Sequence, residues 1–299
     1  MTIITQLQGG LGNQLFQYAT GRALAAHLQT DLLLDRAWFE CPPFGSTPRQ
    51  LELPFLKLPA PSYISTNFAA PIKMGLIQSF IQSFSPSKPK VYHEKMGFTF
   101  DAKLFKVKLN KNQDLFIFGY WQSFKYFSSI RLALQSECQP TAHISEHYGF
   151  YLKKIQSTES IMLHIRRGDY LTSPSAMQIH GVLNINYYLT AIQLILKELP
   201  SAHFFIFSDD IAWTKNALPK DLRSTFIETD SNANSPSQEL QLMMHCRHHI
   251  IANSSFSWWG AWLKFASTGI VIAPSRWLTK QKNGLSDLLP PEWIVLANK

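Results

Sequence analysis

Apolar runs of strand length alternate with helical patterns through the second half of the chain. Strands are predicted at 160–163, 203–207, 249–252 and 269–273, and helices at 186–199, 238–246 and 256–266. The strand runs are continuously apolar, as in strands that are buried on both faces. A helix between successive strands is the connection that a parallel sheet needs. This half therefore predicts a doubly wound, parallel α/β sheet.

The first half of the chain opens in the same way, with a β-branched run at 2–7, a glycine-rich turn at 9–12 and helical spacing from 15 to 28. A chain of 299 residues is long for one hydrophobic core and comfortable for two. We therefore expect two Rossmann-like domains facing a cleft, 1–155 and 156–299. The boundary is placed in an amphipathic, more polar segment just before the strand at 160, and the last segment could pack back on the first domain.

The glycine-rich turn resembles the opening of a dinucleotide-binding fold, with Asp35 after the second strand. It departs from the G-x-G-x-x-G pattern because Leu15 stands where the third glycine would be. Asn13 and Gln14 are large polar residues at the start of the helix. Asn13 could simply cap the helix, but two polar side chains exceed what a cap needs, so we expect both to project toward a ligand.

Composition excludes several classes of function. The formal charge of +8 and a pI near 9.3 suit an anionic ligand or an anionic membrane surface. No clustered basic helix or nucleic-acid motif is present. Cys41, Cys138 and Cys246 form no CxxC pair, so neither a disulfide framework nor a cysteine zinc site is predicted. Without a long apolar run or a leader, we expect a soluble cytoplasmic protein, which could still contact a membrane peripherally.

The segment 41–100 is the least regular part of the chain and is rich in proline and aromatic residues. It predicts loops and short helices where acceptor recognition could lie. Tyr120 and Trp121 follow a strand predicted at 114–118 and could stack on a sugar ring, although aromatic residues at such positions are more often core.

Polar residues follow three strands of the second half, at 166–169, 208–210 and 253–255. The carboxyl ends of strands in an open α/β sheet are where ligands bind. An arginine offers a planar fork of donors to phosphate or carboxylate, and Ser254 and Ser255 lie where the N–H groups of the next helix are free. Together these residues suit a diphosphate.

Alternatives remain open at the same strand ends. Arg167 could form an ion pair with Asp169 that only closes the turn. Asp209 and Asp210 could bind ribose hydroxyls or a guanine edge, or could ligate magnesium; with arginine present to neutralise phosphate, the metal is ranked second. The histidine-rich segment 245–249 has no second ligand pair at zinc spacing, so no metal ligand is assigned.

The motifs in order carry a resemblance to a known family. Residues 164–170 read HIRRGDY, which resembles the HxRRxD motif of the α-1,2-, α-1,6- and protein-O-fucosyltransferases. Four further segments resemble the bacterial α-1,2-fucosyltransferases of glycosyltransferase family 11, namely 9–18, 119–123, 207–210 and 253–263. Several ordered motifs are far more specific than any one of them.

The resemblance implies a GT-B fold, GDP-β-L-fucose as donor, a galactoside as acceptor, and inversion to an α-1,2-fucoside without a required metal or cofactor. By position in the motif, Arg166 binds the β-phosphate and stabilises the leaving GDP. Arg167 and Asp169 hold the loop or the nucleotide, and His164 belongs to the same donor-binding motif. Asn13 resembles an asparagine that reaches the donor from the N-terminal domain, which would be the acceptor side.

The remaining donor-binding residues come from two segments. Ser254, Ser255 and Phe256 match the segment that contacts diphosphate and fucose in the family. Ser208, Asp209 and Asp210 are placed on the nucleotide, with their individual roles left open.

The general base is the least determined part of the site. An oxocarbenium-like transition state delays proton transfer from the acceptor and reduces the need for a strong base. Asp169 is a candidate from the motif, and His180 because its loop could bring it to the same strand end. The alternatives are an ion pair for Asp169 and a loop hydrogen bond for His180.

Two other functions stay in view. An NAD-dependent oxidoreductase would rest on the glycine turn and Asp35, and a non-catalytic glycan- or nucleotide-binding protein would keep the fold without turnover. Neither explains five ordered motifs. The sequence leaves the acceptor open among lactose, N-acetyllactosamine and a lipid-linked O-antigen repeat.

Overall fold

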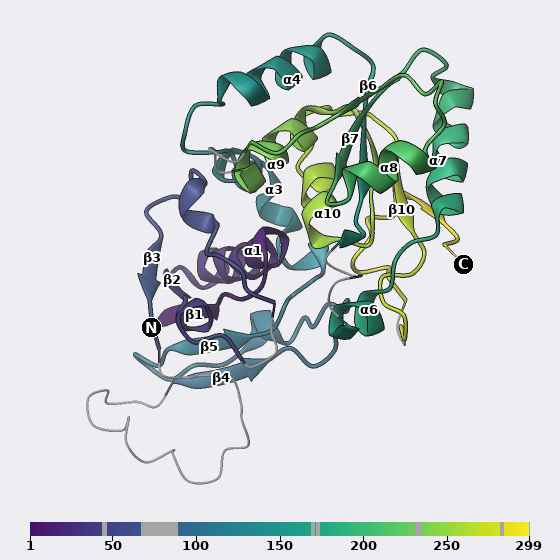
Figure 1. The fold of residues 1–299 in the computed structure, drawn as a ribbon. Helices are drawn as coiled ribbons and strands as arrows, with labels where there is room; N and C mark the ends of the chain where they lie inside the picture. Colours follow the sequence, from purple (N-terminus) through teal and green to yellow (C-terminus); the bar gives the residue numbers. More distant parts are fainter. Residues whose placement is uncertain are drawn as a thin grey trace. The chain divides into compact units, whose positions relative to one another are not determined.

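The computed structural model describes residues 1–43, 47–66, 89–168, 171, 174–230, 235–281 and 284–298. The chain divides into two compact units. Unit 1 comprises residues 1–54 and 58–131, and unit 2 comprises residues 55–57 and 132–299. Each unit is an α/β structure with a parallel sheet of its own (Figure 1).

The sheet of unit 1 has five strands in the order β3-β2-β1-β5-β4, and all of the neighbouring pairs are parallel. The elements up to residue 130 are β1 (Thr2–Gln6), α1 (Leu11–Leu28), β2 (Asp31–Asp35), α2 (Ala37–Glu40), η1 (Leu53–Phe55), β3 (Ser62–Ile64), β4 (Lys90–His93), η2 (Leu104–Lys106), β5 (Leu115–Phe118), η3 (Phe124–Tyr126) and η4 (Ser128–Ile130). From β1 the chain moves outward to β2 and β3, and β5 lies on the other side of β1. From β3 the chain crosses to the opposite edge at β4 and then steps inward to β5, so the steps from β1 to β2 and from β4 to β5 run in the same direction across the sheet.

Helix α1 forms the centre of unit 1. It packs on β1 and β2, and it is buried along most of its length, with Phe16 against Phe127 at 5.8 Å between ring centroids. Gly10 is its N-cap residue, so Asn13 does not cap it. The helix ends at Gln29, which adopts the left-handed conformation (φ 51°) and closes the last turn with backbone hydrogen bonds.

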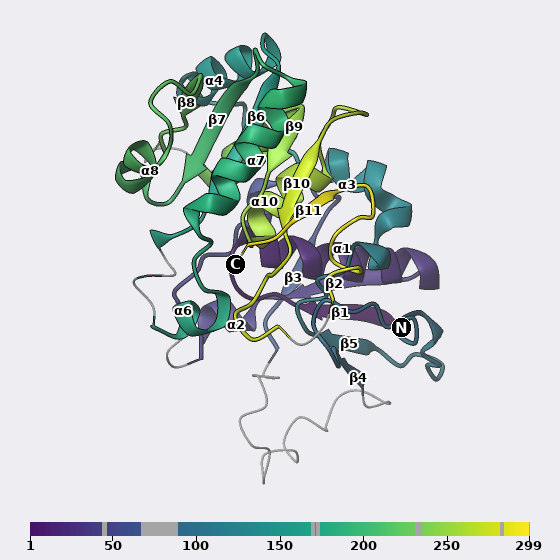
Figure 2. The same ribbon diagram turned by 90° about the vertical axis from the view of Figure 1, so that its right-hand side faces the viewer.

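The sheet of unit 2 has six strands in the order β11-β10-β9-β6-β7-β8, again with all neighbouring pairs parallel (Figure 2). The elements from residue 131 are α3 (Arg131–Glu137), α4 (Glu146–Gln156), β6 (Ser160–Ile165), α6 (Pro174–His180), α7 (Ile185–Glu198), β7 (His203–Ser208), α8 (Ile211–Ala217), β8 (Ser224–Phe226), α9 (Ser235–His245), β9 (His248–Ile250), α10 (Ser255–Trp262), β10 (Val271–Pro274) and β11 (Ile294–Leu296). This is the strand order of a dinucleotide-binding Rossmann sheet, with its switch point between β6 and β9.

Alternate residues of β6 face opposite helix layers. Ile161, Leu163 and Ile165 belong to the core that α7 covers. On the other face His164 meets α10, and α9 and α10 pack against each other. The tryptophans of α10 are buried, and the Nε1–H of Trp258 donates to the carbonyl of Leu288 at 2.8 Å.

The division between the units at residue 131 precedes the boundary expected at 155. Helix α4 belongs to unit 2 because its apolar side, with Tyr148, Tyr151 and Ile155, is buried where it packs on α9. The last strand, β11, completes the sheet of unit 2 beside β10. Among the described residues no helix is both long and apolar enough to cross a membrane.

Candidate functional site

The switch point of the unit 2 sheet collects the predicted phosphate-binding residues. Arg166 and Arg167 follow β6, and residues 253–255 follow the neighbouring strand β9 and lead into α10. Ser208, at the end of β7, pairs in register with Ile165 at the end of β6. The structure therefore brings together the three strand ends that the sequence singled out.

Asp209 fastens the turn that carries the two arginines. Its Oδ1 accepts hydrogen bonds from the backbone N–H groups of Arg167 at 2.8 Å and Gly168 at 2.9 Å. Its Oδ2 lies 3.1 Å from Nε of Arg166. A Cβ on Gly168 would lie 3.0 Å from the carbonyl oxygen of Asp209, so glycine allows this close approach. The carboxylate thus sets the position of Arg166 through one edge of the guanidinium.

The side chains of Asp210 and Arg167 contact α8 and do not take part in the hydrogen bonds that Asp209 makes to this turn. Oδ1 of Asp210 caps α8 by accepting from the N–H of Trp213 at 3.1 Å, and Oδ2 forms an ion pair with Nε of Arg167 at 3.4 Å. The guanidinium of Arg167 also lies over the Trp213 ring, 4.3 Å from its centroid. Arg167 therefore supports the loop, and its described ionic partner is Asp210. Asp169 lies outside the described residues.

Ser208 completes this segment as a structural group. Its Oγ accepts from the N–H of Asp210 at 3.0 Å and shares a hydrogen bond with the hydroxyl of Thr214 at 3.0 Å. All three side chains of 208–210 thus have partners within the protein. Among the described residues no three His, Cys, Asp or Glu side chains gather as a metal-binding group.

The N-terminus of α10 follows strand β9, which is the neighbour of the strand β6 that leads into the arginine turn. Ser254 caps the helix by accepting from the N–H of Phe256 at 3.3 Å, and its carbonyl accepts from Ser257 Oγ and from the N–H of Trp258. Ser255 is partly exposed. Helix N-termini direct N–H groups and a partial positive charge at an anion, so this end adds to the charge of Arg166.

His164 is a neutral imidazole inside the site. Burial first, and then the nearby Arg166, lower its pKa to about 3, with Asp209 opposing the shift. Its ring meets Phe256 edge-on at 6.2 Å. Within the described part of the chain, its buried Nδ1 has no hydrogen-bond partner.

His180 is brought to the same strand ends, as the sequence suggested. Burial lowers its pKa, and Arg166 lowers it further through charge. Its carbonyl accepts from Nδ2 of Asn253 at 3.0 Å, and the same amide donates to the carbonyl of Trp277 at 3.2 Å. Asn253 therefore ties the end of α6 to the turn after β9.

Sequence reasoning missed a second carboxylate whose charge interacts with that of Arg166. Glu239 on α9 accepts from Thr229 Oγ1 at 3.1 Å and from the Tyr148 hydroxyl at 3.4 Å. Burial raises its pKa, while these hydrogen bonds and the charge of Arg166 lower it. The sequence does carry a signal for it. Glu239 is the sole acidic residue of α9, and it directly precedes the apolar residues that this helix buries.

In unit 1 only part of the predicted polar turn is available to a ligand. Gln14 is fully buried; its Nε2 donates to the carbonyls of Gly9 and Gln50, and its Oε1 accepts from the N–H of Glu52. The expectation that Gln14 projects toward a ligand is therefore wrong. Asn13 is half-buried, and its Oδ1 accepts from Nε2 of Gln122 at 2.9 Å.

Trp121 takes the core role that the sequence analysis gave as the more usual one. Its ring is fully buried and packs edge-on against Tyr126 at 5.6 Å, so it does not stack on a sugar. Tyr120 remains exposed at 44%.

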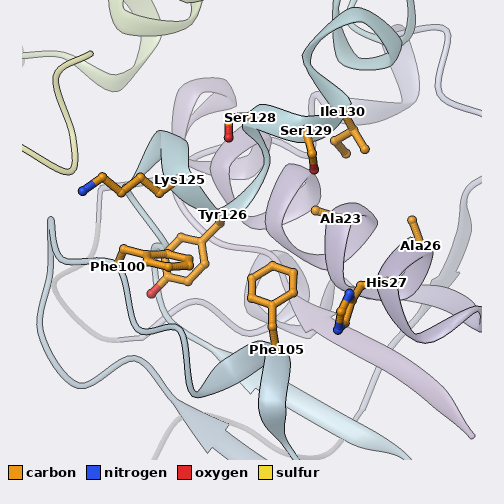
Figure 3. A pocket seen from close by; sticks show the side chains of 10 residues that line it. All are labelled: Ala23, Ala26, His27, Phe100, Phe105, Lys125, Tyr126, Ser128, Ser129 and Ile130. Carbon is orange, nitrogen blue, oxygen red and sulfur yellow. The ribbon is translucent and has the colours of Figure 1, made fainter. Parts of the chain in front are cut away.

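A cavity of about 470 Å³ in unit 1 contains none of the predicted site residues. Figure 3 shows the rings of Phe100 and Tyr126 beside each other and Phe105 beside His27, the latter pair at 5.4 Å. These rings pack on one another and line an open hollow at the C-terminal half of α1.

Comparison with known proteins identifies the family. The model of glycosyl transferase family 11 matches residues 90–297. This chain belongs to that family. It is 32% identical to the α-1,2-colitosyltransferase of Escherichia coli over 98% of each chain. It is 30% identical to the O-antigen biosynthesis glycosyltransferase WbnK of Escherichia coli over 97% of this chain and 99% of that one.

A solved structure agrees on the fold. NodZ α-1,6-fucosyltransferase soaked with GDP-fucose superposes with a TM-score of 0.51 at 14% identity, over 88% of this chain and 92% of that one. The GT-B-like α/β architecture expected from the sequence is thus confirmed. The family 11 resemblance is confirmed as well.

Membership in family 11 removes support for the oxidoreductase alternative. The acid on which it rested, Asp35, is buried and fastened to its own loops. Its Oδ1 accepts from the N–H groups of Ala37 and Thr66, and its Oδ2 from the Thr66 hydroxyl at 2.5 Å. The family 11 chain uses this carboxylate to organise unit 1.

Proposed function

We propose that this family 11 glycosyltransferase transfers L-fucose from GDP-β-L-fucose to the 2-hydroxyl of a β-galactoside, inverting the anomeric centre to give an α-1,2-fucoside. The observation that carries the proposal is the switch point of the unit 2 sheet. There Arg166, held by Asp209, lies at the end of the strand next to the one that leads into the serine-capped α10.

Arg166 stabilises the leaving diphosphate. Negative charge grows on the β-phosphate as the glycosidic bond breaks, and a preorganised guanidinium is worth most where charge develops. Asp209 orients the guanidinium through Nε before substrate arrives. The N–H groups at the start of α10, with Ser254, Ser255 and Phe256, add a second source of positive potential for the same anion.

His164 and the aspartates act around the nucleotide. A neutral imidazole beside Arg166 adds no positive charge and offers Nδ1 as a polar atom to the guanosine part of the donor. Ser208, Asp209 and Asp210 hold the loop that frames the nucleotide, and Arg167 supports them from the α8 side. Asn13, which the family resemblance assigns to the donor, contributes an amide N–H group.

Inversion requires the acceptor hydroxyl to lose its proton on the face opposite GDP. His180, with its lowered pKa, is neutral at pH 7 and able to accept this proton. Asp169 of the motif is the other candidate. With an oxocarbenium-like transition state the proton leaves late, so a weak base suffices.

No metal ion or other cofactor takes part in this proposal. Arg166 and the α10 N-terminus supply the positive charge that a divalent cation supplies in metal-dependent transferases. Turnover in excess EDTA tests this directly.

The deciding experiment measures GDP release from purified protein with GDP-fucose and lactose in EDTA. We expect acceptor-dependent release that Arg166→Ala lowers by about 10²–10³-fold. Arg247→Ala is the matched control, since Arg247 pairs with Glu159 at the opposite end of β6. The anomeric proton coupling of the product distinguishes inversion to the α-linkage from retention.

Donor choice is decided in the same assay. The name of the colitosyltransferase relative makes GDP-colitose, whose sugar lacks the 3-hydroxyl of fucose, the competing donor. A kcat/KM that is higher with GDP-colitose than with GDP-fucose would show that colitose is the donor sugar. GDP binding without turnover on lactose, N-acetyllactosamine or an O-antigen repeat would support the non-catalytic binding protein instead.

The acceptor is proposed to be a galactose-terminated glycan, and WbnK points to an O-antigen intermediate. A lipid-linked acceptor would place this chain, with its charge of +8, at an anionic membrane surface. Cosedimentation with anionic vesicles at low and high salt tests that contact.

A further inference from the structure

We infer that Gln122 is a positioning residue that fixes the polarity of the Asn13 amide, so that Asn13 offers its Nδ2–H to the donor substrate. The inference rests on the proposed function, which places Asn13 at the donor. Gln122 itself touches no substrate in this proposal; it acts through Asn13.

The two residues follow the carboxyl ends of two adjacent strands of the unit 1 sheet. Strands β1 and β5 are parallel neighbours, with Thr5 opposite Ile117 near their carboxyl ends. Asn13 follows β1, in the first turn of α1, and Gln122 follows β5, 109 residues further along the chain. The carboxyl ends of the strands form the edge at which an open α/β sheet presents groups to a ligand.

The Asn13 amide is confined on both sides. Its Oδ1 accepts from Nε2 of Gln122 at 2.9 Å. Its Nδ2 lies 2.8 Å from the position that a Cβ on Gly9 would occupy, and Gly9 has φ +77°, where glycine is favoured. Because the carbonyl oxygen is engaged by Gln122, the amino group is the end that faces away from it. An asparagine held this way presents a donor, which suits an acceptor oxygen of a sugar nucleotide.

The loop that carries Gln122 is itself held rigidly by Glu94. Its Oε2 accepts from the N–H of Tyr120 at 2.7 Å and its Oε1 from the N–H of Trp121 at 3.1 Å. The N–H of Gln122 also hydrogen-bonds to this carboxylate. A Cβ on Gly119 would lie 2.3 Å from Cβ of Glu94, so only glycine allows this approach.

This loop contains strain at a bulky residue. Trp121 has φ +56°, a conformation that is unfavourable for a tryptophan and persists only where the surroundings enforce it. The buried ring of Trp121 and the Glu94 carboxylate enforce it from two sides. Gln122 is thus a fixed donor, as required of a group that sets the orientation of another side chain.

A double-mutant cycle tests the coupling. We expect Gln122→Ala to lower kcat/KM for GDP-fucose by about 10-fold or more, since a misplacement of ~1 Å at a reacting centre can cost 10²-fold. In the Asn13→Ala background the same change is expected to cost less than about 2-fold, because its target is gone. Equal costs in both backgrounds would overturn the inference.

Gln122→Glu tests the polarity. A carboxylate cannot donate, so it repels Oδ1 of Asn13, and we expect a loss at least as large as that of Gln122→Ala. Full activity of Gln122→Glu would overturn the inference, because it would mean that Gln122 accepts from Asn13. Thermal unfolding of each variant identifies any loss that comes from misfolding, and variants that melt early are replaced by Gln122→Met.

Wild-type turnover and GDP binding separate this inference from the proposed function. If the wild type turns over but the costs of the Asn13 and Gln122 changes simply add, only the role of Gln122 is rejected. A wild-type chain that neither binds GDP in calorimetry nor turns over any donor rejects the proposed function, and the inference with it.

Discussion

Both units carry the residues proposed to bind the donor at the carboxyl edge of a parallel sheet, but with different chemistry. In unit 2 the switch point between β6 and β9 is built from ion pairs, Arg166 with Asp209 and Arg167 with Asp210. In unit 1 the carboxyl ends of the neighbouring strands β1 and β5 lead to two neutral amides, Asn13 and Gln122. The carboxyl edge of a parallel sheet thus carries charged groups in one unit and uncharged groups in the other.

The difference follows from what each kind of pair can specify. A guanidinium held by a carboxylate keeps its charge and its direction, which suits an anion whose charge grows during reaction. An amide pair carries no net charge and determines only whether the amino group or the carbonyl oxygen of Asn13 points away from Gln122. We therefore expect changes in unit 2 to alter catalysis and stability together, and changes in the amide pair to alter catalysis more than stability.

The largest expected effect comes from Asp209→Ala. The change leaves two backbone N–H groups and the Nε–H of Arg166 without this acceptor, so we expect the free energy of unfolding to fall by about 2–3 kcal/mol. With Arg166 misplaced, kcat/KM is expected to fall about 10²-fold. Urea unfolding and GDP release measure the two effects.

Asp210→Ala is the matched control for that change. It removes the cap of α8 and a 3.4 Å ion pair, so about 1 kcal/mol and a smaller loss of turnover are expected. An Asp209→Ala chain as stable as the wild type but unable to bind GDP would contradict the structural role and assign Asp209 to the nucleotide itself.

Asp209 and Asp210 also show which features of the site could be predicted from the sequence and which could not. Strand periodicity and polar strand ends were sufficient to predict that Arg166, Asp209 and Ser254 converge. They could not tell whether Asp209 faces a ligand or the N–H groups of residues 167 and 168, because that depends on how the turn closes. The same limit made Gln14 look like a ligand-binding residue, when its amide is used by residues 9, 50 and 52.

Long-range pairing accounts for the other differences. The partner of Asn13 lies 109 residues away, and no local pattern links Gln122 to it. The sequence placed the domain boundary within α4 because that segment is amphipathic and more polar, but its apolar side packs on α9, about 90 residues later. Glu239 was missed for the same reason, since its partner Tyr148 lies on α4.

Acid is expected to destabilise unit 2 more than unit 1. The two histidines of unit 1, His27 and His93, are exposed, whereas His164 and His249 are buried with pKa values lowered to about 3. Their unfolded forms bind protons near pH 6.5 and their folded forms do not, so stability is full above pH 6.5 and falls as the pH drops toward 3. From pH 6.5 to 5 each buried ring is expected to contribute a loss of about 1.5 kcal/mol.

His164→Gln isolates one of these contributions. The variant is expected to lose stability less steeply than the wild type between pH 6.5 and 5, and the same substitution at the exposed His27 is measured beside it as the control. Urea unfolding at each pH gives the slopes. Parallel slopes for His164→Gln and wild type would show that His164 titrates normally in the folded protein.

Glu94→Gln tests the loop of unit 1 that carries Gln122. A glutamine has one carbonyl oxygen in place of two carboxylate oxygens, so a backbone N–H of residues 120–122 loses its acceptor and about 1–2 kcal/mol of stability is expected to be lost. Glu40→Gln, in an exposed pair with Arg36 at 3.1 Å, is the control, with an expected change of at most about 0.5 kcal/mol. If both variants unfold at the same urea concentration, Glu94 does not hold the loop.

The smallest expected effect compares two serine caps within unit 2. Ser254 caps α10 at the switch point and Ser145 caps α4 by accepting from the N–H of Tyr148. Either serine changed to alanine is expected to cost about 1 kcal/mol of stability, the usual value for a lost cap. Only Ser254→Ala is expected to weaken GDP binding in calorimetry, because the N–H groups it organises are those offered to the diphosphate. Equal GDP affinity in the two variants would separate the end of α10 from the phosphate and leave Arg166 as the anion-binding group of this sheet.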